Sequence, residues 1–220
     1  RQFRTHCLLH DISARVKVER QREEMMKGLS APLGDAFFQS LVRHLARALE
    51  IDFALIGELT DGSPAQIKAL AVYARGEIRE IFSYPLAGAP CETVVAGSRC
   101  SIARGIRDAF PHFTLLTELE AEAYSGTPLF DSSGRFLGII AILHSRPLKD
   151  TAEAEALLQV FASRAGSEIE RLQVEKALLE SSERYRDLSR RFEVLFDGMP
   201  DALMLLTPER QVIWANRKAA

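Results

Sequence analysis

The sequence predicts an α+β fold in which an antiparallel β-sheet carries helices on both faces and is followed by a long C-terminal helix. Three stretches lead to this prediction. Residues 123–147 form an apolar hairpin pattern, residues 53–86 contain three short β-prone segments, and residues 151–197 contain no proline. Because turn residues join the short segments, the strands are expected to run antiparallel.

The hairpin is the most informative stretch. Its turn, Asp131-Ser132-Ser133-Gly134, combines side chains that cap their own backbone with a glycine that tolerates positive φ. The second arm, residues 136–143, is apolar at nearly every position, whereas a strand with one wet face would alternate polar and apolar residues. Helices are therefore expected to cover both faces of this strand.

The first half of the chain contains the other predicted elements. Residues 3–10 are expected to form a short strand that leads into a charged helix ending near Lys27, and Gly, Ser and Pro in residues 28–34 break that helix. Residues 35–50 show helical spacing with one core-facing stripe. The stripe consists of Phe38, Leu41, Val42, Leu45 and Leu49. Segments 53–59, 67–73 and 81–86 then predict an antiparallel meander.

Two segments between the meander and the hairpin contain candidate pocket residues. Pro90 can start a short helix, which places Cys91 and Glu92 in its first turn, where exposed N–H groups favour a carboxylate. The alternative for Cys91 is a small buried hydrophobic residue. Further along, Phe110 and Phe113 bracket Pro111-His112, and Leu115, Leu116 and Leu119 predict a short amphipathic helix. All of these side chains could simply fill a core.

Residues 151–197 predict one helix of roughly 68 Å at 1.5 Å per residue. A domain of this size cannot bury so long a helix, so we expect it to pair with a second copy in a homodimer. Its coiled-coil-like apolar positions are Ile169, Leu172, Tyr185, Leu188, Phe192 and Leu195. The first two residues are out of phase with the later ones, which indicates either a register switch or an ordinary imperfect heptad.

Composition and charge exclude several classes of protein. Hydrophobic residues make up 47% of the chain and the net charge is −2, so there is no basic field for nucleic acid. The longest apolar run is far too short to span a membrane, and no signal peptide follows Arg1. Three cysteines are too few for a disulfide framework and favour the cytoplasm. Without an initiator Met, the chain is expected to be a piece of a longer protein.

Part of the chain resembles a known family. Bacterial GAF domains often close with a Y-x-G-x-P-L-x-D-x-x-G-x-x-L-G run, which is fitted here by Tyr124, Gly126, Pro128, Leu129, Asp131, Gly134, Leu137 and Gly138. Pro90-Cys91-Glu92 and Phe110-Pro111 fit two further elements of this family. The resemblance covers residues 33–148, and residues 150–197 would then be a signalling helix.

The two ends of the chain resemble parts of PAS domains. Residues 1–11 are similar to the last strand of such a domain, followed by a linker helix over residues 12–32. Residues 198–220 are similar to the opening of a second PAS domain. This second resemblance rests on Phe192, Leu195, Pro200-Asp201-Ala202-Leu203, Ile213, Asn216 and Ala219.

The GAF resemblance implies a regulatory role. A pocket between the sheet and the connecting segments would bind an unidentified small molecule, and the helix would relay its state to an output domain outside this chain. That output domain would be a histidine kinase or a cyclic-di-GMP enzyme, either a diguanylate cyclase or a phosphodiesterase. The candidate ligand-binding residues are Cys91, Glu92, Phe110, Phe113, Leu119 and Tyr124. The alternative is a ligand-free dimerisation spacer.

Catalytic and cofactor signatures are absent from the sequence. There is no phosphate-binding loop, no Cys/His pair with zinc spacing and no kinase or cyclase motif, so we expect neither catalysis nor a metal. The family's cyclic-nucleotide signature is not present after Phe113, and neither Cys91 nor Cys100 precedes the His used for bilin attachment. An activity like that of the GAF-type free methionine sulfoxide reductases remains an alternative, with Cys91 and Cys100 as the thiolate and its partner.

Overall fold

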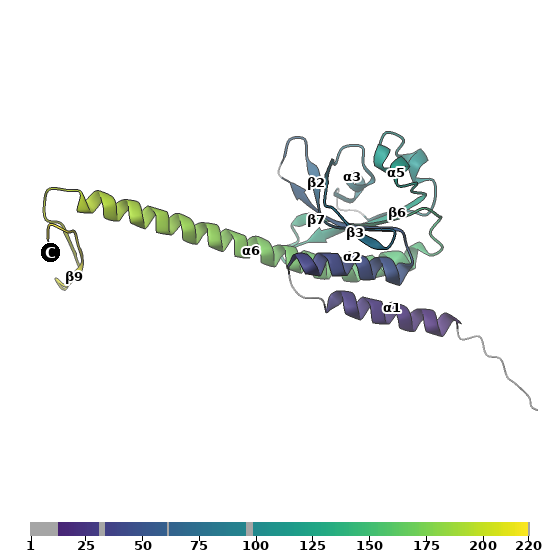
Figure 1. Cartoon of the computed structure of the whole chain (residues 1–220), viewed down its shortest axis with the longest axis horizontal. Coiled ribbons are helices and arrows are strands. Elements are labelled where there is room, and N and C mark those ends of the chain that lie inside the picture. The colour runs from purple at the N-terminus through teal and green to yellow at the C-terminus, as the bar shows by residue number, and fades with distance from the viewer. Residues whose placement is uncertain (1–12, 31–33, 61, 96–98, 220) are drawn as a thin grey trace, which may run out of the picture. The chain divides into compact units, whose positions relative to one another are not determined.

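A computed structural model describes residues 13–30, 34–60, 62–95 and 99–219. The chain divides into two compact units, Arg1–Glu170 and Arg171–Ala220 (Figure 1). The predicted end of a PAS domain at residues 1–11 lies outside the described residues. The α+β class is confirmed, because the first unit is an antiparallel sheet with helices on both faces and a long C-terminal helix follows it.

One sheet dominates the first unit. Its strands are β1 (Phe53–Thr60), β2 (Gln66–Ala74), β3 (Glu77–Arg79), β4 (Ser83–Pro85), β5 (Cys100–Ile102), β6 (Ala123–Phe130) and β7 (Phe136–His144). The order is β3-β2-β1-β7-β6-β5, with β4 also paired to β2, and every pairing is antiparallel. The segment predicted as one strand over residues 81–86 is shorter, and β3 precedes it directly after the Gly76 turn.

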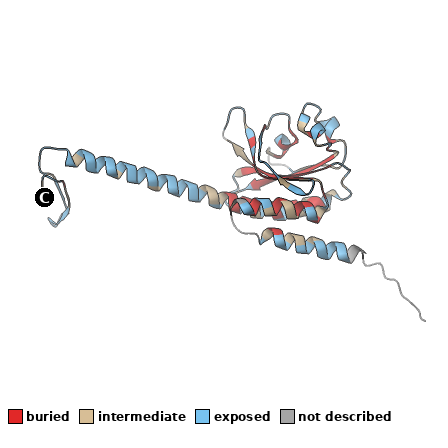
Figure 2. Cartoon of the chain, viewed as in Figure 1, coloured by how far each residue is buried: buried red, intermediate tan, exposed pale blue. Residues whose placement is uncertain are grey.

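Helices cover both faces of the sheet. On one face lie α2 (Asp35–Leu49) and the first part of α6 (Thr151–Asp197), with α1 (Ser13–Leu29) packed on α2 (Figure 1). On the other face lie the short helices α3 (Pro90–Val95), α4 (Ile106–Ala109) and α5 (Thr114–Glu118). Every residue of β7 after Phe136 is buried (Figure 2), which confirms the expectation from its unbroken apolar pattern.

The layer formed by α2 and α6 is held by aromatic packing and by one buried carboxylate. Phe37 and Phe38 on α2 meet edge to face, with ring centroids 5.4 Å apart, and Phe161 on α6 is fully buried. Glu168 is only 1% exposed, and its carboxylate accepts a hydrogen bond from the N–H of Gly34 at 2.8 Å. The carboxylate thereby joins α6 to the start of α2, where free N–H groups favour a negative charge.

The hairpin between β6 and β7 is closed by Asp131. Its carboxylate accepts hydrogen bonds from the N–H groups of Ser133 and Arg135, both at 2.9 Å, from the Ser133 hydroxyl at 2.7 Å and from Arg135 Nε at 2.9 Å. These donors lower the pKa of Asp131, led by the Ser133 hydroxyl and the Arg135 side chain. Each donor stabilises the ionised form, so the turn depends on the charge of this side chain.

The free energy of unfolding is therefore expected to fall in acid, because the Asp131 carboxylate becomes protonated. Its pKa is lowered on folding, so its contribution is complete above its usual value of 3.8 and is lost as the pH falls below that value. Urea unfolding of the chain and of Asp131→Asn at pH 6 and pH 3 measures the effect. The variant should be less stable at pH 6 and should lose less stability on acidification. An equal loss in the two proteins would contradict this role for Asp131.

The second unit contains the rest of α6 and a small hairpin, β8 (Met204–Leu206) and β9 (Val212–Ala215). The side chain of Asn216 links the segments of this unit by hydrogen bonds. This fully buried side chain accepts a hydrogen bond from the Leu203 N–H at 2.9 Å and donates to the carbonyls of Phe196, at 3.0 Å, and Asp201, at 2.9 Å. A single amide thus satisfies backbone groups from three segments.

Candidate functional site

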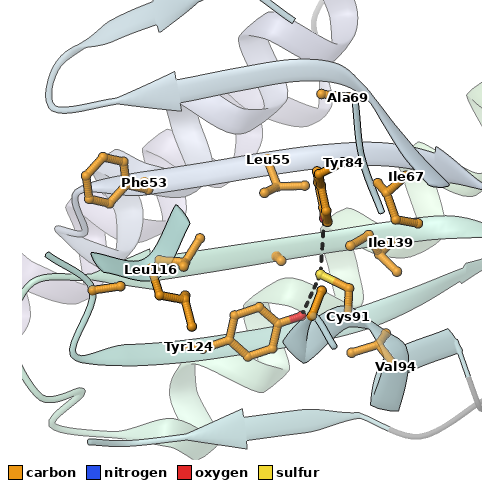
Figure 3. Close-up of a cluster of buried hydrophobic side chains, with 14 of the residues drawn as sticks. Phe53, Leu55, Ile67, Ala69, Tyr84, Cys91, Val94, Leu116, Tyr124 and Ile139 are labelled. Atoms are coloured by element: carbon orange, nitrogen blue, oxygen red, sulfur yellow. Dashed lines mark hydrogen bonds between the residues drawn. The ribbon is translucent and has the colours of Figure 1, made fainter. Parts of the chain in front are cut away.

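A cavity of about 370 Å³ lies between the sheet and the connecting segments that carry α3 and α5. Its walls are aliphatic and aromatic (Figure 3). The apolar side chains that line it include Phe53, Leu55, Val72, Phe82, Phe113, Leu115, Leu116, Leu119 and Leu143. A volume in this range suits a small organic molecule, since ligand pockets in proteins measure about 300–1,000 Å³.

Strand alternation determines which side chains reach the cavity. Phe53 and Leu55 on β1 both line the cavity, because alternate residues of a strand share one face. Tyr124 on β6 pairs in register with Leu143 on β7, so both side chains come to the same face. Pro90 starts α3 and places Cys91 in its first turn, where the thiol is 3% exposed.

A buried cluster of two tyrosines and a thiol lies against the cavity (Figure 3). The Tyr84 hydroxyl and Cys91 Sγ are 3.1 Å apart, and the Tyr124 hydroxyl donates a hydrogen bond to the same sulfur at 3.4 Å. Burial raises the pKa of Cys91, although hydrogen bonds with both tyrosines act in the opposite direction. Burial also raises the pKa of Tyr84 and of Tyr124 well above the usual value. All three groups therefore stay neutral near pH 7.

A neutral Cys91 is a poor nucleophile, because the thiolate is the reactive form. Burial raises the pKa of Cys100 as well. Burial outweighs the hydrogen bonds at Cys91, so neither thiol is activated, and the cluster presents fixed polar groups on an otherwise apolar wall. Among the residues that the structure describes, no group of His, Cys, Asp and Glu could hold a metal ion.

The structure brings four of the six predicted ligand-binding residues to the cavity, namely Cys91, Phe113, Leu119 and Tyr124. The other two lie elsewhere. Glu92 is exposed, and its carboxylate accepts a hydrogen bond from the Gly88 N–H at 2.9 Å, which ties it to the loop before α3. Phe110 packs against the buried apolar residues around Cys91 and Tyr124 but is not in the cavity wall.

Sequence reasoning missed Tyr84 and the charged rim of the cavity. The alternation of Phe82 and Tyr84 on either side of Ser83 was an available signal that two aromatic side chains share one face. The rim contains Arg75, Arg79, Glu80 and Glu118, which come from the β2–β3 hairpin and from α5. No local pattern indicated that these two segments would meet.

The arginines at the rim are already occupied. Arg75 donates a hydrogen bond to the Glu120 carboxylate at 2.8 Å and lies over the Phe53 ring, 5.5 Å from its centroid. Arg79 pairs with Glu77 at 3.2 Å. Both ion pairs are exposed to solvent, so they hold the side chains in place only weakly.

The predicted dimer residues of α6 lie in different surroundings. Ile169 is 2% exposed within the first unit, because α6 still packs beneath the sheet there, so it is not available to a partner in this conformation. Leu172 is half-buried. Leu188, Phe192 and Leu195 are 49–64% exposed in the second unit.

Comparisons with known proteins agree on the fold. A GAF domain model matches residues 34–169, and a PAS domain model matches residues 190–220. The GAF match extends past the predicted end at Leu148, and the added residues include the part of α6 that packs beneath the sheet. The PAS match agrees with the predicted opening of a PAS domain. No curated protein matches the chain.

Several solved structures share this fold. The GAF domain from a phosphoenolpyruvate-protein phosphotransferase of Coxiella burnetii matches with a TM-score of 0.59 at 19% identity, over 74% of this chain and 98% of its own. The corresponding Acinetobacter domain gives 0.57 at 12% identity, with the same two coverages. A bacteriophytochrome from R. palustris gives 0.56 at 12% identity over 89% of this chain, which spans 45% of that protein. At these identities the shared property is the fold.

Proposed function

This chain belongs to the GAF domain family, and we propose that it is a sensory module of a bacterial signal-transduction protein that binds a small organic molecule in the cavity beside Cys91. The observation that carries the proposal is the cavity itself. It measures about 370 Å³ and combines apolar walls with a few fixed polar groups, as ligand pockets usually do. The ligand-binding residues are Cys91, Phe113, Leu119 and Tyr124, together with Tyr84.

The path from the cavity to α6 is short. Tyr124 lines the cavity from β6, and Phe130 ends the same strand. A Cβ atom at Gly166 on α6 would overlap the carbonyl oxygen of Phe130, so helix and strand are in backbone contact there. A ligand that shifts β6 would therefore press directly on α6. The helix then continues into the second unit, which carries the PAS opening.

We propose that α6 passes the state of the cavity onward as a parallel homodimer in the cytoplasm. The output domain would lie outside this chain and would be a histidine kinase or an enzyme of cyclic-di-GMP signalling. In this proposal the module itself catalyses no reaction, consistent with the protonated thiol of Cys91. No helix among the described residues is both long enough and apolar enough to cross a membrane.

A second function is favoured by the exposed apolar residues of α6 in the second unit. They support dimerisation whether or not the cavity is occupied. The module would then be a spacer that holds two chains in register, and its cavity would have no ligand. The two functions differ in what the purified chain binds.

A ligand-binding module should be stabilised by its ligand, and filling the cavity should abolish the effect. Native mass spectrometry of the purified chain and a small-molecule thermal-shift screen would identify binders. A ligand at 100 times its Kd adds about 2.7 kcal/mol of stability, which raises the Tm by several degrees. Leu119→Trp should remove the shift, because Leu119 lines the cavity.

Val160→Trp is the matched control, because Val160 lies on α6, is 43% exposed and is not in the cavity wall. This variant should keep the shift. A chain that retains no small molecule and shifts with none in the screen would favour the spacer.

A further inference from the structure

Three aromatic rings form one wall at the mouth of the cavity. The Tyr84 ring contacts Phe82, with centroids 5.9 Å apart, and Phe113, with centroids 5.7 Å apart. The same three side chains also line an adjoining groove of about 380 Å³. The rings therefore stand where the cavity and the groove meet, with Phe82 36% exposed.

The free charges at this mouth are negative. Arg75 and Arg79 are paired with Glu120 and Glu77, as described above. Glu80 and Glu118 are exposed and make no hydrogen bond or ion pair with the described part of the chain. Glu118 lines both the cavity and the groove, beside the aromatic wall. The groove adds one further titratable side chain, His112.

The interior cannot hold a charge. Its walls are apolar, and the hydroxyls of Tyr84 and Tyr124 are already engaged with Cys91. A charged group buried there would lose its hydration without gaining a partner, which costs far more than burying an apolar group. A charged ligand must therefore place its apolar body inside and its charge at the mouth.

We propose that the ligand is an amphipathic cation, with an aromatic or aliphatic body in the cavity and an ammonium group at the mouth beside Phe82, Tyr84, Phe113 and Glu118. Aromatic faces attract cations and are used to recognise ammonium ligands, and the Glu118 carboxylate adds an attraction of the same sign. The proposal rests on the proposed function, that this cavity binds a small molecule, and names the chemical class.

Three indoles that differ only at the end of the side chain test the proposal. Tryptamine carries an ammonium group, indolepropionate a carboxylate and ethylindole neither. Calorimetric titration of the full chain should show tryptamine binding about tenfold more tightly than ethylindole, with indolepropionate weakest. Glu118→Gln should weaken tryptamine about threefold to tenfold and leave ethylindole unchanged. Arg79→Gln, which removes a rim charge of the opposite sign, should leave tryptamine unchanged or tighter.

The outcomes separate this proposal from the sensory function. Equal binding of all three indoles, or tightest binding of indolepropionate, would overturn the cation and leave the sensory cavity supported. Tryptamine binding that persists in Leu119→Trp would place the site elsewhere and overturn the proposal. If no indole binds, the proposal is also overturned, whereas a molecule retained in native mass spectrometry would still support sensing.

Discussion

The double variant Leu188→Asp, Leu195→Asp is expected to be monomeric at concentrations where the unmodified chain is a dimer. Tyr185, Leu188, Phe192 and Leu195 have coiled-coil spacing and are 49–73% exposed in the second unit. Burying each is worth about 1.5–3 kcal/mol. Four from each of two helices exceed the lower estimates, about 4 kcal/mol, for the freedom lost on association.

Two Asp residues per helix would place four charges in the seam, the apolar surface through which the two helices would pair. Losing the four leucines alone should weaken association by at least about a thousandfold. Light scattering across a concentration series measures the effect. Leu179→Asp is the matched control, because Leu179 is 60% exposed but lies outside this seam, and it should remain dimeric.

Two results would contradict the α6 dimer. A monomeric unmodified chain at tens of micromolar would exclude this helix as a strong interface. A double variant that stays dimeric would move the interface to another surface, such as the exposed side of α1 or α2. The core-facing stripe of α2 cannot serve, because Phe38 is 1% exposed.

The second large effect is expected from Gly138→Ala in β7. Gly138 pairs with Glu58 across the centre of the sheet. A Cβ atom there would overlap the carbonyl oxygen of Gly57 and approach Glu58 Cα to 2.9 Å. Both neighbours are backbone atoms of β1, which is held on both sides by other strands, so neither can move cheaply. We expect a loss of about 3 kcal/mol or more, or roughly 6–12 °C in Tm.

Gly134→Ala separates the clash from backbone strain. Gly134 has a φ of 85° and no atom within 4 Å of an added Cβ. That substitution should cost only about 1–2 kcal/mol, the usual penalty for a left-handed residue. Urea unfolding followed by circular dichroism compares the two. Equal losses would show that β1 and β7 can separate enough to admit a methyl group.

Local patterns in the sequence were sufficient to predict three elements. The stripe on residues 35–50, the unbroken apolar arm of the hairpin and the proline-free stretch correspond to α2, β7 and α6. The stripe on α2 has its cause within one element, since the helix period determines which side chains share a face. The motif glycine Gly138 was also visible, although its reason, the backbone of β1, was not.

Tertiary structure decided the composition of the site. Cys91 and Tyr124 were found from the sequence, but Tyr84, which meets the same sulfur, was not. Tyr84 is only seven residues from Cys91, but the pairing of β4 with β2 sets the face on which its side chain lies. The charges at the rim of the cavity were also decided by tertiary contacts. Arg75 pairs with Glu120, which is distant in sequence, so the charge left free at Glu118 is a property of the assembled fold.

The long helix shows both contributions in one element. Its extent, residues 151–197, follows from a sequence without proline, because backbone hydrogen bonds inside a helix need no partner elsewhere. The spacing of its apolar residues could not show which of them are exposed and available to a partner. Ile169 is buried and Leu188 is exposed although both fit a coiled-coil position, because burial depends on whether the sheet lies beside that turn of the helix.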